Sequence, residues 1–169
     1  MKNQNSFIAI IGDQNIILNW NEKDIALLTL VGAALSESQS FEVAISFFLS
    51  SILAQNDTKL DYDNLMENHT SKTLGWLSDK LKKELGNEKI SLAIDRAREK
   101  RNFLVHNILK KYKWPFMSEE DYLNCLLEIN AIRRVISESK IEIGQVLKDE
   151  KILKLITLTD EDIDQLKSF

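Results

Sequence analysis

Three side chains with complementary chemistry lie within six residues of one another: Arg101, Asn102 and His106. A guanidinium group offers a fixed fork of donors to a phosphate and stays charged at any working pH. An imidazole can take a proton from a hydroxyl group or give one to a leaving oxygen. An amide can hold the imidazole or the phosphate in place. These groups could together promote attack of an RNA 2′-hydroxyl group on the adjacent phosphate, and so cleave RNA without a metal ion.

The spacing of these residues on a helix limits how they can act together. Asn102 and His106 are four residues apart and therefore share a helix face, whereas Arg101 and His106 differ by about 140° in helical phase. The side chains of Arg101 and His106 must therefore turn toward each other to act on one phosphate. Cleavage through a cyclic phosphate also needs both an acid and a base, and one chain offers one well-placed histidine. A two-fold dimer would supply two.

The positive charge of this acidic chain is concentrated around the same residues. The formal net charge is −4, but the segment from Asp95 to Lys113 holds seven basic and two acidic residues, a net charge of +5 that leaves −9 for the rest. One basic segment can attract a polyanion locally, although a solvated charged helix face explains the pattern as well. Besides Arg101, the candidate RNA-binding residues are Arg96, Arg98, Lys110, Lys111 and Lys113.

Other kinds of chemistry have little support in the sequence. His69 and His106 are the two histidines, Cys125 is the one cysteine, and none has the neighbours of a zinc site. His69 stands in a polar run, Glu67 to Thr70, which favours solvent exposure or helix capping. No nucleophile elbow, P-loop or dinucleotide-binding motif occurs. We therefore expect no metal ion and no cofactor.

The apolar segments are too short to cross a membrane. Ile25–Leu35 and Phe41–Leu53 are separated by a polar run, so neither reaches the roughly 20 residues that a bilayer requires. Ile8–Ile11 is also too short for the apolar part of a signal peptide. These features, with the single cysteine, predict a cytoplasmic protein that has no membrane anchor.

Length and composition predict one all-α domain over residues 1–169. Apolar residues make up 44% of the chain and charged residues 28%, which is ordinary for a globular protein. Helical periodicity predicts a bundle of four main helices with additional short ones. The main helices are expected at Glu22–Gln55, from a cap at Thr70 or Ser71 to Gly86, at Glu88–Tyr112, and from Ser118 to about Lys148–Leu153.

The remaining segments are expected to be short elements. Residues 1–20 could form a β-hairpin, with strands at Phe7–Ile11 and Ile16–Asn19 around a turn at Gly12-Asp13-Gln14-Asn15. Short helices are expected near Tyr62–Asn68 and within residues 154–169, where Thr159 could cap the helix. Leu28, Val31 and Leu35 begin the apolar stripe expected on the first long helix.

Arg101-Asn102-Phe103-Leu104-Val105-His106 resembles the Arg-x(4–6)-His motif of the HEPN superfamily, which often reads Arg-Asn-x-x-x-His. The upstream segment Thr73–Leu77 is also similar to bacterial HEPN proteins. The resemblance implies a helical bundle that forms a homodimer, with the motifs of both protomers in one cleft. It further implies metal-independent RNA cleavage, often by toxins or defence effectors. Arg101 would contact the scissile phosphate, His106 would be the acid or base, and Asn102 would orient them.

Two alternatives remain open beside the nuclease. The superfamily includes inactive members, so the chain could be a non-catalytic dimer that binds a partner protein, or a module that binds RNA without cutting it. Some HEPN toxins also carry a tyrosine two residues after the histidine, which a partner enzyme modifies, but Ile108 stands there in this chain. Silencing by that route is therefore not expected, and an antitoxin or a partner effector protein remains a candidate partner. Trp76, Tyr112 and Trp114 could stack on bases, although packing is the commoner role of such residues.

Overall fold

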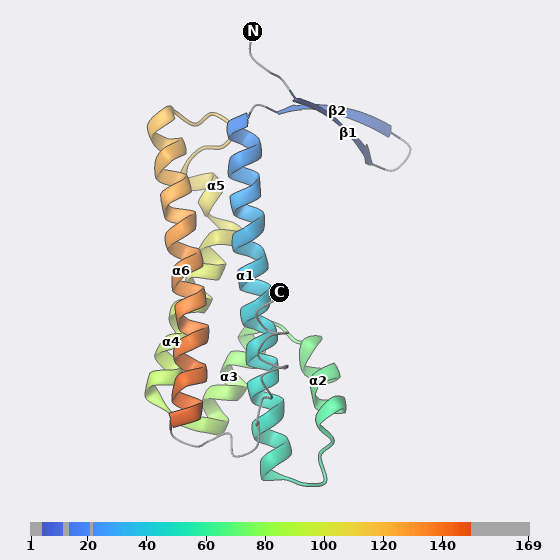
Figure 1. Cartoon of the computed structure of the whole chain (residues 1–169), viewed down its shortest axis with the longest axis vertical. Coiled ribbons are helices and arrows are strands. Elements are labelled where there is room, and N and C mark those ends of the chain that lie inside the picture. The colour runs from blue at the N-terminus through green and yellow to red at the C-terminus, as the bar shows by residue number, and fades with distance from the viewer. Residues whose placement is uncertain (1–4, 12–13, 21, 150–169) are drawn as a thin grey trace. The chain divides into compact units, whose positions relative to one another are not determined.

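The computed structural model describes residues 5–11, 14–20 and 22–149 of the chain. Within these residues it confirms the all-α fold, and none of their helices is long and apolar enough to cross a bilayer. The described residues form six helices (Figure 1), which are α1 (Glu22–Asn56), α2 (Tyr62–Thr70), α3 (Leu74–Leu85), α4 (Glu88–His106), α5 (Ile108–Lys111) and α6 (Glu119–Asp149).

Two strands precede the helices, as the sequence allowed. β1 (Asn5–Ile11) and β2 (Gln14–Trp20) pair in antiparallel fashion, with Asn5 opposite Trp20 and Ile11 opposite Gln14. Gln14 and Asn15 were expected in the turn, but they belong to β2. The predicted turn residues Gly12 and Asp13, and the predicted helix within residues 154–169, lie outside the described residues.

The described contacts divide the chain into two compact units. Unit 1 comprises residues 1–41 and 95–139, and unit 2 comprises residues 42–94 and 140–169. Unit 1 therefore contains the Arg101–His106 motif and the whole basic segment, and unit 2 contains His69. The organisation of residues 1–169 as one domain stays a prediction.

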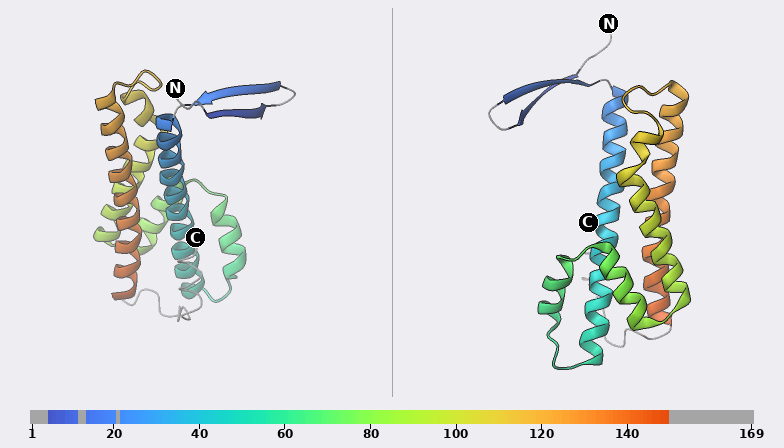
Figure 2. Two further views of the ribbon diagram at one scale, coloured as in Figure 1. Left: turned by 45° about the horizontal axis from the view of Figure 1, so that its top comes forward. Right: turned by 180° about the vertical axis from the view of Figure 1, so that it is seen from behind.

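Within each unit, the segments of α1 and α6 lie side by side and run in the same direction (Figures 1 and 2). In unit 1, Lys23 near the start of α1 forms an ion pair with Glu119 at the start of α6, across 96 residues of sequence. In unit 2, a side chain added at Gly144 would meet the ring of Phe48 at 3.8 Å, and these residues are also 96 apart. Within each unit the two helices therefore pair with the same offset.

Small side chains determine which face of α1 is buried in unit 1. The buried residues there are Leu27, Ala34, Ser38 and Phe41. Of the residues that begin the predicted stripe, Leu28 and Val31 are half-buried and Leu35 is 37% exposed, so this part of the stripe lies at the edge of the buried face. Ala34 and Ser38 allow a neighbouring backbone to approach closely, and a pattern based on the largest apolar side chains misses this face.

The positions of the helix ends are set by capping residues more than by the first or last apolar residue. α3 begins after Thr73, whose hydroxyl group accepts a hydrogen bond from the Trp76 amide, and not after the predicted Thr70 or Ser71. Gly86 ends α3 with a φ of 59°, which a residue without a Cβ adopts at low cost, as predicted. Ser118 caps α6 by accepting from the Asp121 amide, also as predicted.

Candidate functional site

The helix that carries the motif ends at His106, earlier than the predicted Tyr112. Asn107 follows with a φ of −126°, and the short helix α5 begins at Ile108. The Asn107 side chain makes no capping hydrogen bond, and the Asn107 amide still donates to the Phe103 carbonyl at 2.9 Å, so the break lies in the backbone angles of this residue. His106 is therefore the last residue of α4 and not an internal helical residue.

Arg101 faces the packed side of α4 in unit 1. It lies four residues after Ala97 and three before Leu104, and both of these are buried. The Arg101 side chain is half-buried, and its Nε atom is shielded from solvent. Its Nη1 atom donates a long hydrogen bond of 3.4 Å to Oδ1 of Asn102. The apolar part of the side chain thus packs with the core, while the guanidinium group extends toward Asn102.

Asn102 and His106 are both exposed, one helical turn apart. The structure therefore brings Arg101 into contact with Asn102 and places His106 on the same face as Asn102. It does not place Arg101 and His106 on one face of α4. The exposed pair is the part of the predicted site that solvent, and hence a substrate, can reach.

Four of the five candidate RNA-binding residues are exposed. Arg96, Lys110, Lys111 and Lys113 have exposed side chains, and Arg98 is half-exposed. Lys113 has a φ of 54°, so it forms the left-handed turn after α5. The basic segment is thus largely an exposed surface of unit 1.

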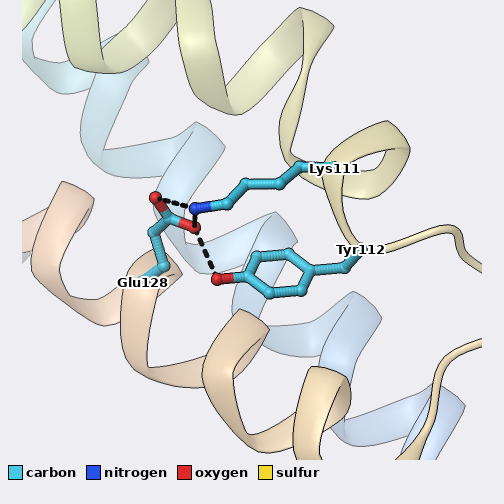
Figure 3. A network of polar contacts seen from close by, with 3 residues as sticks. All are labelled: Lys111, Tyr112 and Glu128. Atoms are coloured by element: carbon cyan, nitrogen blue, oxygen red, sulfur yellow. Dashed lines mark hydrogen bonds and ion pairs between the residues drawn. The ribbon is translucent and has the colours of Figure 1, made fainter.

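Lys111 is held by an acidic partner on α6. Its Nζ atom donates hydrogen bonds of 2.9 and 2.7 Å to the two carboxylate oxygens of Glu128, and the Tyr112 hydroxyl group donates one of 2.8 Å to the same carboxylate (Figure 3). The ammonium group also lies 5.7 Å from the ring centre of Phe103 and 5.0 Å from that of Tyr112. Lys111 is therefore less available to a phosphate than its exposure suggests.

This cluster shifts the pKa values of its members. Burial would raise the pKa of Glu128, but the hydrogen bonds from Lys111 and Tyr112 outweigh it and lower that pKa. The hydrogen bond to Glu128 raises the pKa of Lys111. Burial, followed by the bond to Glu128, raises the pKa of Tyr112. All three groups therefore keep their ordinary charge states at neutral pH.

Cys125, in the same unit, is fully buried. Burial, with a smaller effect of the Glu128 charge, raises the pKa of its thiol to about 11. The thiolate is the nucleophilic form of cysteine, and it is nearly absent at neutral pH. Cys125 therefore contributes packing to unit 1 and is a poor nucleophile.

His69 in unit 2 is buried, contrary to the expectation of solvent exposure or capping. It is 4% exposed, its Nδ1 atom shares a hydrogen bond of 2.7 Å with the Ser50 hydroxyl group, and its ring centre lies 5.6 Å from that of Trp76. Burial, followed by the charges of Lys80 and Lys72, lowers its pKa. Tyr62, which also faces inward, lies seven residues before His69 on α2. This spacing of two helical turns is the sequence signal that could have predicted the burial of His69.

The aromatic residues considered for base stacking differ in availability. Tyr112 is half-buried and its hydroxyl group is bonded to Glu128, whereas Trp114 and Trp76 are 37% and 43% exposed. Trp114 follows the basic segment in unit 1. Trp76 belongs to unit 2 and packs beside His69. Trp114 is therefore the aromatic residue best able to accompany the motif.

Among the residues described, no group of three or more histidine, cysteine or acidic side chains could hold a metal ion. Comparison of the chain with models of known protein families, with curated proteins and with solved structures gave no match. The resemblance to the HEPN superfamily therefore rests on the residues of the motif, and the helical fold is compatible with it.

Proposed function

We propose that the chain is a metal-independent endoribonuclease that acts as a homodimer, with Arg101, Asn102 and His106 of both protomers lining one cleft. The observation that carries the proposal is the exposure of Asn102 and His106 on one turn of α4, next to Arg101. The surrounding exposed basic residues support it, because they can attract a polyanion to this part of an otherwise acidic chain. Such an activity suits a toxin or defence effector that a partner protein restrains.

In the proposed reaction, the imidazole of one protomer takes the proton of the 2′-hydroxyl group. The 2′-oxygen then attacks the adjacent phosphorus and forms a 2′,3′-cyclic phosphate. The imidazole of the second protomer gives a proton to the departing 5′-oxygen, so the reaction is balanced without another reactant. Arg101 would stabilise the charge on the phosphate, and Asn102, which already contacts Arg101, would orient it.

Cleavage of a mixed RNA pool in the presence of EDTA tests this proposal. The wild-type protein should yield products with 2′,3′-cyclic phosphate ends, and His106→Ala should lower the rate by about 100-fold or more, because acid–base groups contribute on that scale. Val105→Ala is the matched control, since Val105 is an exposed neighbour on the same helix and has no titratable group. Intact RNA after incubation with the wild-type protein would refute the nuclease.

Mixed dimers test the requirement for two copies of the motif. Wild-type and His106→Ala protomers with different tags can be co-expressed, and the heterodimer can be isolated by sequential affinity steps. A cleft that uses both histidines should lose nearly all activity when one is removed. Retention of half of the wild-type activity would show that each protomer works alone, and a monomer in light scattering would remove the dimer from the proposal.

A second candidate function is a non-catalytic HEPN-like module that binds a protein partner or RNA. The partial burial of Arg101 on the packed side of α4 favours it, because a packed guanidinium group can serve stability instead of catalysis. In that case RNA remains intact, and Arg101→Ala lowers the thermal midpoint as much as truncation of a half-buried packing residue does. RNA binding that weakens steeply with salt, without products, would identify the RNA-binding version.

A further inference from the structure

Unit 1 contains a pocket of about 550 Å³ that none of the motif residues lines. Six of its seven lining residues come from one face of α6 between Leu127 and Ser137, and Glu37 of α1 completes it. Its volume falls within the roughly 300–1,000 Å³ that is usual for small-molecule sites. Nothing in the proposed nuclease reaction uses this pocket.

Two consecutive arginines give the pocket its chemistry. Arg133 and Arg134 both line it, against the single carboxylate of Glu37, so its lining carries a net positive charge of one. Arg133 is half-buried, and its Nε atom is shielded from solvent and has no hydrogen-bond partner among the described residues. Because Nε is out of reach of a ligand in the pocket, an oxyanion would be bound by the terminal nitrogens of the Arg133 and Arg134 guanidinium groups.

The other lining residues indicate what kind of anion fits. The Asn130 amide and the Ser137 hydroxyl group add further donors around the arginines, and a phosphate group has enough oxygen atoms to engage several donors at once. Leu127, which is 68% exposed, and Ala131 provide an apolar wall. The pocket therefore combines a polar region for a charged group with an apolar region for an organic one.

We propose that this pocket binds a small organic phosphate, with the phosphate group at Arg133 and Arg134 and the organic part against Leu127. The site is independent of Arg101 and His106. Its occupant would lie on α6 beside Glu37 of α1, with the phosphate at the arginines and turned away from that carboxylate. Binding should raise the thermal midpoint of the protein.

Titration calorimetry on the full chain, with phenyl phosphate as the probe, tests the site. Phenyl phosphate should bind more tightly than inorganic phosphate, which lacks the organic part, and more tightly than benzoate, which lacks the phosphate. Arg133→Gln and Arg134→Gln should each weaken phenyl phosphate binding at least tenfold. Lys110→Gln is the charge-matched control, since it removes one exposed positive charge of unit 1 that does not line the pocket.

The possible outcomes distinguish a built phosphate site from nonspecific attraction of anions and from an RNA-binding surface. Equal loss of binding in Lys110→Gln and Arg134→Gln would overturn the proposal, because only net charge would then matter. Equal affinity for benzoate would overturn the choice of phosphate. Weakened binding of a single-stranded RNA in Arg134→Gln, with no phenyl phosphate binding by the wild type, would assign the arginines to RNA and reject a small ligand. Arg134 is exposed, so Arg134→Gln remains informative if Arg133→Gln fails to fold.

Discussion

His69 and His106 occupy opposite environments in the two units. His69 is 4% exposed, bonded to Ser50 and packed beside Trp76, whereas His106 ends α4 with an exposed side chain. Their sequence contexts suggest the reverse, since His69 follows polar residues and His106 follows Phe103, Leu104 and Val105. The comparison shows that the helix face, more than the neighbouring residue types, determines which histidine is available to a substrate.

The largest expected effect is on stability, and it should distinguish the two histidines. His69→Ala removes a buried ring and leaves the Ser50 hydroxyl group without its partner, so we expect it to lower the free energy of unfolding by about 2–4 kcal/mol. His106→Ala changes an exposed residue and should stay within about 0.5 kcal/mol of the wild type. Urea unfolding monitored by circular dichroism measures both. Equal losses would contradict the contrast between the two environments.

A pH dependence of stability should follow from His69. Burial and the nearby lysines lower its pKa in the folded protein, so the unfolded chain binds more protons in the interval below its ordinary pKa of 6.5. The free energy of unfolding should therefore fall as the pH drops through about 6.5 and below, and His69→Gln should lose most of this slope. Glu128 does not interfere, because its pKa is lowered from 4.5 and its contribution disappears only in more acidic solution. An unchanged slope in His69→Gln would assign the effect to other groups.

A smaller effect is expected on the salt dependence of RNA binding, through Lys111, the candidate RNA-binding residue that an acidic side chain holds. Glu128→Gln removes the charge that holds Lys111, so a further lysine becomes available to RNA phosphates. On the proposed function, the slope of log affinity against log salt should steepen by about one unit. Fluorescence anisotropy with a labelled oligonucleotide measures it, and the double variant Glu128→Gln/Lys111→Gln should restore the original slope. An unchanged slope would show that Lys111 has no part in binding.

The sequence predicts the helices well because their ends depend on local chemistry. Gly86 and Ser118 are recognisable as capping residues from their types and positions, and each acts as one in the structure. The C-terminal end of α4 is predicted too late, because Trp114-Pro115 is the stronger stop signal in the sequence while Asn107 already breaks the helix. A single asparagine is a weak signal, since many asparagines lie inside helices without ending them.

The candidate site is less predictable from the sequence than the fold. The motif gave the exposed pair Asn102 and His106, but the spacing alone did not show that Arg101 lies between Ala97 and Leu104 on the packed face. The sequence around Lys111 shows no acidic partner for its ammonium group, because the partner Glu128 lies 17 residues away on another helix. Burial and pairing of this kind arise from contacts between helices. The pattern of residues within one helix gives no information about those contacts.

The pairing of α1 with α6 bears on how the chain folds as it is synthesised. The Lys23–Glu119 and Phe48–Gly144 pairs each close a loop of 96 residues, more than half of the 169-residue chain, whereas α3 and α4 are joined through the local turn at Gly86. Contacts between distant residues form slowly, because the entropy of the loop must be lost first. A ribosome-bound chain that ends before Glu119 therefore lacks the helix that pairs with α1, and the contacts between α1 and α6 have to wait for α6 to emerge.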